Sequence, residues 1–242
     1  MYFKIMFFLL LLVFYINNTI GFFTPQIKTT NGNVLKLYGT GSPVLFSPGL
    51  FGSMPDFFYG NLITELKKNN TIITINGFSP ISKNTIEEIC DTLKVDKIGY
   101  IGHSSFNPEI LDNSKYINNA LLIDPINIPS FNFNDGFNNR KINSDFPITI
   151  IKAKKLYYSS RSLPKWQYPI FKKKVYEEYY EDVGHPDILD NFWADIAKSL
   201  NLWDMAEREK MNYKEWKLKS KNSIPSIRKK YIEYVSRKFY SL

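Results

Sequence analysis

Short apolar runs alternate with amphipathic segments along most of this chain. Runs rich in Val, Ile and Leu predict strands, and apolar residues spaced three or four apart predict helices. Strands are expected over residues 34–38, 43–47, 71–75, 97–102, 120–123 and 147–151, and helices over 57–68, 84–93 and 192–202. Because these helices separate consecutive strands, the pattern predicts an α/β fold with a mainly parallel central sheet and helices on both faces.

The N-terminus carries a short hydrophobic segment. Lys4 precedes 12 apolar residues, Ile5 to Ile16, which is the length of a signal-peptide core. A bilayer-spanning helix needs about 20 such residues. We therefore predict a signal peptide or signal anchor over residues 1–23 and entry into the secretory pathway, with the protein secreted or membrane-anchored. A single domain is expected over 24–204, followed by a basic, aromatic-rich helical tail over 205–242.

The positive charge is concentrated in that tail. The chain has a formal charge of +8, and residues 206–242 hold 11 Lys or Arg and 4 Asp or Glu. A solvated helical face is the favoured interpretation. Contact with an anionic membrane surface is the alternative, because Tyr231, Tyr234, Phe239 and Tyr240 interleave with the basic residues there. Since the rest of the chain is nearly neutral, we expect no nucleic-acid partner.

Cysteine and histidine are scarce. Cys90 is the only cysteine, which excludes an intrachain disulfide and a thiolate metal cluster. It lies in an apolar helical pattern and is expected to pack in the core. Only His103 and His185 could supply imidazole ligands, so metal chemistry is poorly supported.

The strongest candidate for chemistry follows the strand predicted over 97–102. That strand leads directly into Gly102-His103-Ser104, as a nucleophile elbow requires. In an elbow a strained backbone lifts the serine hydroxyl above the sheet edge, and small residues two before and two after it prevent backbone clashes. Gly102 meets this requirement, whereas Phe106 occupies the second small position. Ser104 is therefore the candidate nucleophile.

A Pro48-Gly49 turn ends the strand predicted over 43–47. A glycine turn at this place can present a backbone N–H to a developing oxyanion, as can the residue after the nucleophile. We therefore expect the N–H groups of Leu50 and Ser105 to form an oxyanion hole. An ordinary Pro-Gly turn is the alternative interpretation.

His185 is the candidate general base. It lies late in the chain, in Gly184-His185-Pro186, between the last predicted strand and a predicted helix. This position satisfies the order serine, acid, histidine. The chain has two histidines, and one adjoins Ser104 while the other lies where a base is needed, which favours a functional role.

Asp124 is the candidate acid of the triad. It directly follows the strand predicted over 120–123, and sites form at the carboxyl ends of parallel strands. Asp135 and Asp145 are weaker candidates, and two further aspartates, Asp187 and Asp190, are expected to cap the helix that follows them.

These motifs resemble those of the α/β-hydrolase superfamily, and most of all those of chlorophyllases and related lipase- or esterase-type serine hydrolases. Such enzymes carry a Gly-His-Ser-x-Gly elbow, a Leu-Asp-Pro strand exit and a Gly-His-x-Asp-x-Leu-Asp histidine loop. The corresponding segments here are Gly102-His103-Ser104-Ser105-Phe106, Leu122-Ile123-Asp124-Pro125 and Gly184-His185-Pro186-Asp187-Ile188-Leu189-Asp190. The resemblance extends from about Pro43 to Leu200.

The resemblance implies an activity. Ser104 would be the nucleophile, His185 the base and Asp124 the carboxylate that orients it. A small-molecule or lipid ester would be hydrolysed through an acyl-enzyme, without a cofactor. Aromatic residues near the site, such as Phe57 and Phe58, would suit an apolar substrate. Ordinary core packing is the alternative interpretation of each of them.

A protein that has kept the fold and lost catalysis is the alternative. Two features favour it. Phe106 stands where the elbow needs a small residue, and the separation of only 20 residues between Ser104 and Asp124 leaves room for only a short supporting helix. Such a protein would bind a lipid or a protein partner. The three triad residues in the required order favour the enzyme, since packing alone does not require them.

Overall fold

The computed structural model describes residues 24–49, 54–76, 81–105, 110–112, 114–126, 141–153, 170–181, 183–196 and 225–241. The predicted leader, Leu50, Phe106 and residues 197–224 lie outside this part of the chain.

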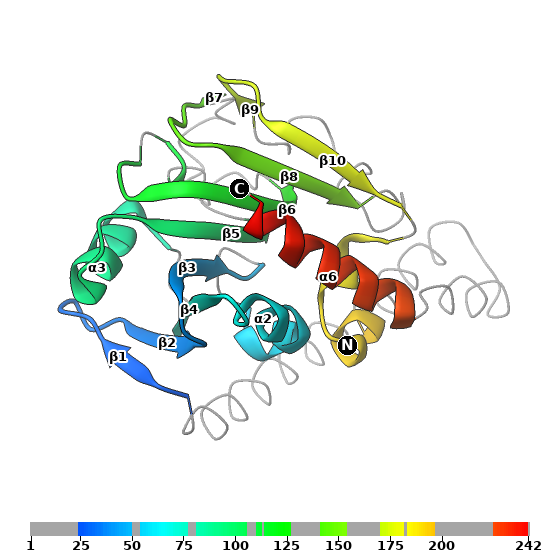
Figure 1. Cartoon of the computed structure of the whole chain (residues 1–242), viewed down its shortest axis with the longest axis horizontal. Coiled ribbons are helices and arrows are strands. Elements are labelled where there is room, and N and C mark those ends of the chain that lie inside the picture. Colours follow the sequence, from blue (N-terminus) through cyan, green and yellow to red (C-terminus); the bar gives the residue numbers. More distant parts are fainter. Residues whose placement is uncertain are drawn as a thin grey trace, which may run out of the picture.

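An eight-stranded sheet forms the centre of the fold, with the strand order β1-β2-β4-β3-β5-β6-β8-β10 (Figure 1). β2 is antiparallel to both neighbours, and all pairs from β4 to β10 are parallel. The predicted mainly parallel sheet is thereby confirmed. Its strands are β1 (Gln26–Lys28), β2 (Val34–Tyr38), β3 (Ser42–Ser47), β4 (Asn70–Asn76), β5 (Ile98–Ser105), β6 (Ile117–Ile126), β8 (Ile148–Ala153) and β10 (Tyr176–Tyr180), while β7 (Lys141–Ile142) pairs with β9 (Ile170–Phe171).

Helices cover both faces of the sheet. Side chains alternate along each strand, so that Ile72 packs with the core under α2 (Gly60–Leu66) and α6 (Pro225–Tyr240), while Ile73 packs with the core under α3 (Lys83–Leu93). The continuous apolar run over residues 120–123 of β6 is explained by this burial on both faces, since its residues alternate between the two cores. The predicted two-faced arrangement is confirmed.

Two predicted helices begin at other residues than expected. Ser82 caps α3, because its hydroxyl accepts the Thr85 N–H and Thr85 reciprocates. Around 57–68, a 3-10 turn, η2 (Asp56–Tyr59), precedes α2. The Asp190 carboxylate accepts the N–H of Asn61, in the first turn of α2, at 2.8 Å. Its expected role as a cap of the helix that follows it stays a prediction.

Cys90 is buried on α3, as expected from its apolar pattern. Burial raises the pKa of its thiol to about 11, with neighbouring acidic residues acting in the same direction. The thiol is therefore protonated near neutral pH and belongs to the core.

Helix α6 lies within the fold, although it comes from the segment predicted as a tail. It crosses one face of the sheet beside α2 (Figure 1). Tyr231 and Phe239 are buried, and a Cβ added to Gly99 of β5 would lie 2.7 Å from Phe239 Cζ. Gly99 thus allows the close approach of α6. Two aromatic residues that suggested a membrane-facing tail therefore face the core.

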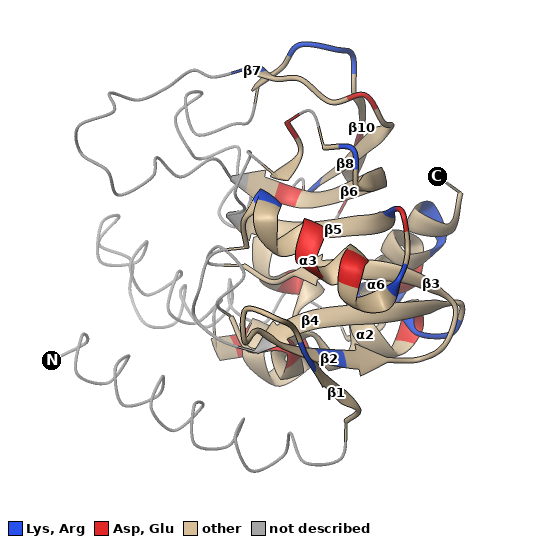
Figure 2. Ribbon diagram, turned by 90° about the vertical axis from the view of Figure 1, so that its left-hand side faces the viewer, with Lys and Arg blue, Asp and Glu red and all other residues tan. Residues whose placement is uncertain are grey.

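The charged residues of the described elements are distributed over several surfaces. Basic and acidic positions are interspersed along the ribbon in Figure 2. On α6, Lys229, Lys230 and Arg237 are exposed. None of the helices in the described ranges is both long and apolar enough to cross a membrane.

Candidate active site

The carboxyl ends of β3, β5, β6 and β8 lie together, because these four strands are adjacent and parallel. Gly49 follows β3, Ser104 lies near the end of β5, and Asp124 lies near the end of β6. Parallel strands therefore bring residues that are far apart in sequence to one edge of the sheet, where ligands bind in such folds.

Ser104 occupies the sharp turn that an elbow requires. Its φ of 59° lies in the left-handed region, which is uncommon for a residue with a side chain. The pairing of β5 with β6 becomes irregular at the same point, between His103 and Ser105. The strained backbone turns the hydroxyl away from the ladder and toward His185.

The structure brings Ser104, His185 and Asp124 into a hydrogen-bonded chain. Ser104 Oγ lies 2.9 Å from His185 Nε2, and His185 Nδ1 lies 2.6 Å from Asp124 Oδ2. A carboxylate can only accept, so Nδ1 carries the proton and Nε2 accepts from the serine hydroxyl. This tautomer is the one that a general base needs.

Asp124 is held rigidly for this contact. Its side chain is 1% exposed, and its φ of 43° is a second left-handed conformation at the sheet edge. The backbone N–H of Ala153, at the end of β8, donates to Asp124 Oδ1 at 3.3 Å. Of the other acids considered, Asp145 pairs with Lys173 at the surface, Asp187 accepts the Gly184 N–H, and Asp135 lies outside the described residues.

The turn after β3 approaches Ser104 closely. A Cβ added to Gly49 would lie 3.4 Å from Ser104 Cβ and 3.0 Å from Met54 Sδ. The N–H of Gly49 is already occupied, because it donates to Tyr59 Oη at 3.0 Å. Leu50, the first expected oxyanion donor, lies outside the described residues. Ser105, the second, ends β5 directly after the nucleophile.

Tyr59 and His103 join the site, and neither was assigned a role from the sequence. The Tyr59 hydroxyl lies 2.8 Å from His103 Nδ1, and His103 Nε2 lies 3.2 Å from the carbonyl oxygen of His185. The two imidazoles stack at 4.7 Å. His103 adjoins the serine in sequence, which was a usable signal, whereas nothing in the pattern around Tyr59 indicated this contact.

Burial and the neighbouring His185 imidazole hold the pKa of His103 well below its usual 6.5, against a smaller opposing effect of its hydrogen bond to the His185 carbonyl. His103 is therefore neutral near pH 7. Because a carbonyl can only accept, His103 Nε2 is the donor and Nδ1 accepts from Tyr59. Burial also raises the pKa of the Tyr59 hydroxyl, which keeps it protonated.

A buried ion pair fixes the loop that carries His185. This residue begins a 3-10 turn, η7 (His185–Ile188), and the N–H of Gly184 donates to Asp187 Oδ2 at 2.7 Å. Arg228 of α6 donates to Asp187 Oδ1 at 3.0 Å, and both side chains are almost fully buried. Arg228 also binds Asp195 and Asn191. Helix α6 thus helps to place the histidine.

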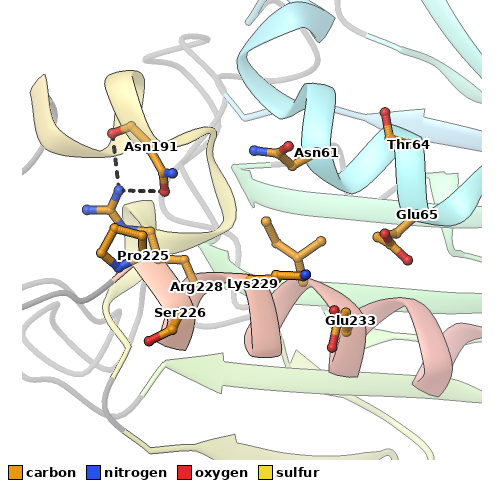
Figure 3. Close-up of a pocket in the computed structure, with 10 residues that line it drawn as sticks. Asn61, Thr64, Glu65, Asn191, Pro225, Ser226, Arg228, Lys229 and Glu233 are labelled. Carbon is orange, nitrogen blue, oxygen red and sulfur yellow. Dashed lines mark hydrogen bonds between the residues drawn. The ribbon is translucent and has the colours of Figure 1, made fainter.

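The same arginine borders a separate pocket of about 360 Å³ between α2, residue 191 and the start of α6 (Figure 3). Its lining includes both acidic and basic residues, such as Glu65 and Lys229. None of the triad residues lines it. Within the described ranges, no group of three or more His, Cys, Asp or Glu residues could hold a metal ion.

No family model matches the chain, and no curated protein matches it in sequence. In three dimensions it is similar to part of a hydrolase from Pseudomonas aeruginosa, with 14% identity and a TM-score of 0.36 over 45% of this chain and 49% of that one. The chain therefore spans about half the length of that protein.

Two proteins from Bacillus subtilis are also similar in structure. One is a putative hydrolase, with 11% identity and a TM-score of 0.46, and the other is naproxen esterase (carboxylesterase NP), with 12% identity and a TM-score of 0.45. Each alignment covers 67% of this chain and 85% of the other.

The fold itself is evident from the sheet. Seven of its eight strands run in the same direction. The eighth, β2, is antiparallel to its two neighbours, β1 and β4. Helices lie on both faces, and the serine turn lies at the carboxyl end of the central strand β5. This arrangement identifies the fold of the chain as that of the α/β-hydrolases.

Proposed function

We propose that the protein is a serine hydrolase that cleaves a carboxylic ester through an acyl-enzyme on Ser104. The observation that carries this proposal is the hydrogen-bonded chain from Ser104 Oγ through both His185 nitrogens to Asp124. In this arrangement the histidine can remove the serine proton and the aspartate can stabilise the resulting imidazolium.

The reaction then has two halves. In the first, Ser104 Oγ gives its proton to His185 Nε2 and attacks the ester carbonyl, and the alcohol leaves with that proton as the tetrahedral intermediate collapses. In the second, water gives a proton to Nε2 and attacks the acyl-enzyme, and Ser104 recovers the proton as the carboxylic acid departs. Backbone N–H groups of Leu50 and Ser105 would stabilise the oxyanion in both halves, at roughly 3 kcal/mol for each donor.

An apolar ester is the proposed substrate class. Phe57 and Phe58, just before Tyr59, pack against Trp193, and Phe58 stacks on the indole at 4.0 Å. Phe192 extends this cluster and is 65% exposed. An aromatic cluster that adjoins Tyr59 in sequence and exposes Phe192 favours an acyl chain or ring over a charged substrate.

Hydrolysis of p-nitrophenyl esters of increasing acyl length tests the proposal. We expect activity that increases from acetate to longer acyl chains, and a fall in kcat of about 10³–10⁶-fold in Ser104→Ala and in His185→Ala. Asp145→Asn, which alters an exposed acid away from the triad, is the matched control and should retain wild-type activity. A folded wild-type protein that hydrolyses none of the esters would favour the non-catalytic alternative.

A further inference from the structure

A continuous hydrogen-bonded chain joins the turn after β3 to the loop that carries His185. The Gly49 N–H donates to Tyr59 Oη, which donates to His103 Nδ1, and His103 Nε2 donates to the carbonyl of His185. Each link has one direction, since an amide N–H only donates, a carbonyl oxygen only accepts, and neutral His103 carries its single proton on Nε2. The backbone N–H of Gly49 and the backbone carbonyl of His185 are therefore joined by hydrogen bonds that all run in the same direction.

These two ends are parts of the site that must keep a fixed separation. One end is the turn after β3, next to the expected oxyanion donor, and the other is the backbone of the general base. Neither part belongs to the strand that carries Ser104. His103 does, because it directly precedes the serine on β5. The hydrogen-bonded chain thus connects the turn at Gly49 and the loop of His185 to β5, the strand that carries Ser104.

Burial makes this chain rigid. His103 is 2% exposed and Tyr59 is fully buried. The Tyr59 ring packs edge-on against Phe46 and against the His103 ring, which in turn stacks on His185. Because a buried polar group that loses its partner is costly, each member holds its neighbours in place.

We propose that Tyr59 and His103 are positioning residues that fix His185 and the turn at Gly49 on either side of Ser104. Neither residue takes a proton from the substrate or contacts the reacting atoms. Their effect is on the alignment of Ser104 Oγ with His185 Nε2, for which a displacement of about 1 Å can lower the rate about 100-fold. This inference rests on the proposed hydrolase activity for its kinetic consequences and on geometry alone for its spectroscopic ones.

The kinetic test compares single substitutions that remove defined links. Tyr59→Phe removes the hydroxyl and keeps the ring, and His103→Phe removes both nitrogen contacts. We expect each to lower kcat for a p-nitrophenyl ester about 10–100-fold while KM changes by less than about 3-fold. His103→Asn, which can still accept from Tyr59, and His103→Gln, which can still donate toward His185, should give intermediate values.

Two further variants separate positioning from a general loss of stability. Tyr100→Phe removes another buried tyrosine hydroxyl, on the opposite face of the sheet, and should leave kcat unchanged. The double variant Tyr59→Phe/His103→Phe should be no slower than the slower single variant, since both break one chain. Additive losses, or equal losses in Tyr59→Phe and Tyr100→Phe, would overturn the proposal.

NMR of ¹⁵N-labelled histidine tests the chain independently of activity. The protein has only two histidines, so each imidazole can be assigned with His103→Asn. We expect His103 to be neutral with its proton on Nε2, and Tyr59→Phe to shift the Nδ1 signal of His103 and the signals of His185. An unchanged His185 spectrum in Tyr59→Phe would refute the chain even in an inactive protein. A wild-type protein that shows the chain but hydrolyses no ester would instead refute the proposed function.

Discussion

At the scale of single residues, the site depends on two strained backbones and one neutral histidine. Ser104 and Asp124 both have positive φ, and each lies where a strand must turn its side chain out of the ladder. Their positions were predictable from sequence, because a strand exit next to Gly-x-Ser or Asp-Pro is a local pattern. The role of Tyr59 was not, since its partner His103 is 44 residues away.

The neutral state of His103 makes a pH-dependent contribution to stability. Its pKa in the folded protein lies well below 6.5, so below pH 6.5 the unfolded chain binds a proton that the folded chain does not. The free energy of unfolding should therefore fall as the pH is lowered from 7.5 to 5, with this residue contributing up to about 1.4 kcal/mol per pH unit. The loss becomes negligible about one pH unit above 6.5, where neither state binds the proton.

Urea unfolding of wild type and His103→Asn at several pH values measures this contribution. The other titrating groups are common to both proteins, so the difference between the two slopes isolates His103. Parallel dependence on pH in the two proteins would show that His103 is not held neutral by the fold.

At the scale of elements, the buried strands are easier to predict from the sequence than the edge strand β10 and the packing of helix α6. Six strands were expected from apolar runs, and each lies within or overlaps an observed strand. β10 was missed because its sequence, Tyr176-Glu177-Glu178-Tyr179-Tyr180, belongs to a largely exposed edge and lacks an apolar run. The packing of α6 was missed because Tyr231 and Phe239 form a helical face among many charges, so that composition suggested a separate tail.

From the ion pair between Arg228 of α6 and Asp187 of η7, we expect Arg228 to be essential for stability. Arg228→Met leaves the Asp187 carboxylate buried without its arginine, and loss of one partner of a buried ion pair destabilises by about 3–5 kcal/mol. Arg237→Met, which alters an exposed arginine on the same helix, should change stability by less than about 0.5 kcal/mol. Equal unfolding free energies for the two variants in urea would contradict the contact.

At the scale of the whole molecule, the basic C-terminal segment both completes the core and exposes charge. Contact with an anionic membrane through Lys229, Lys230 and Arg237 stays a prediction, as does the secretory leader over residues 1–23. The sequence could not reveal that the segment has two roles, because the burial of α6 depends on surfaces formed by β5 and α2, far away in the chain.

Truncation after Asn222 tests how much the fold depends on α6. It removes Tyr231, Ile232, Val235 and Phe239 from one core and leaves Asp187 without Arg228. Loss of several buried side chains at 2–5 kcal/mol each exceeds the usual stability of a domain, so we expect no cooperative thermal transition. A truncated chain that melts cooperatively near the wild-type temperature would mean that α6 is dispensable.

The most direct test of the account is whether Ser104 is a nucleophile. Intact-mass spectrometry after treatment with a fluorophosphonate should show one adduct on the folded wild-type protein, and peptide mapping should place it on Ser104. Ser104→Ala should remain unmodified, and Asp124→Asn should react more slowly, since its His185 would lose the correct tautomer. Folded wild-type protein without an adduct, or with an adduct that persists in Ser104→Ala, would contradict the account.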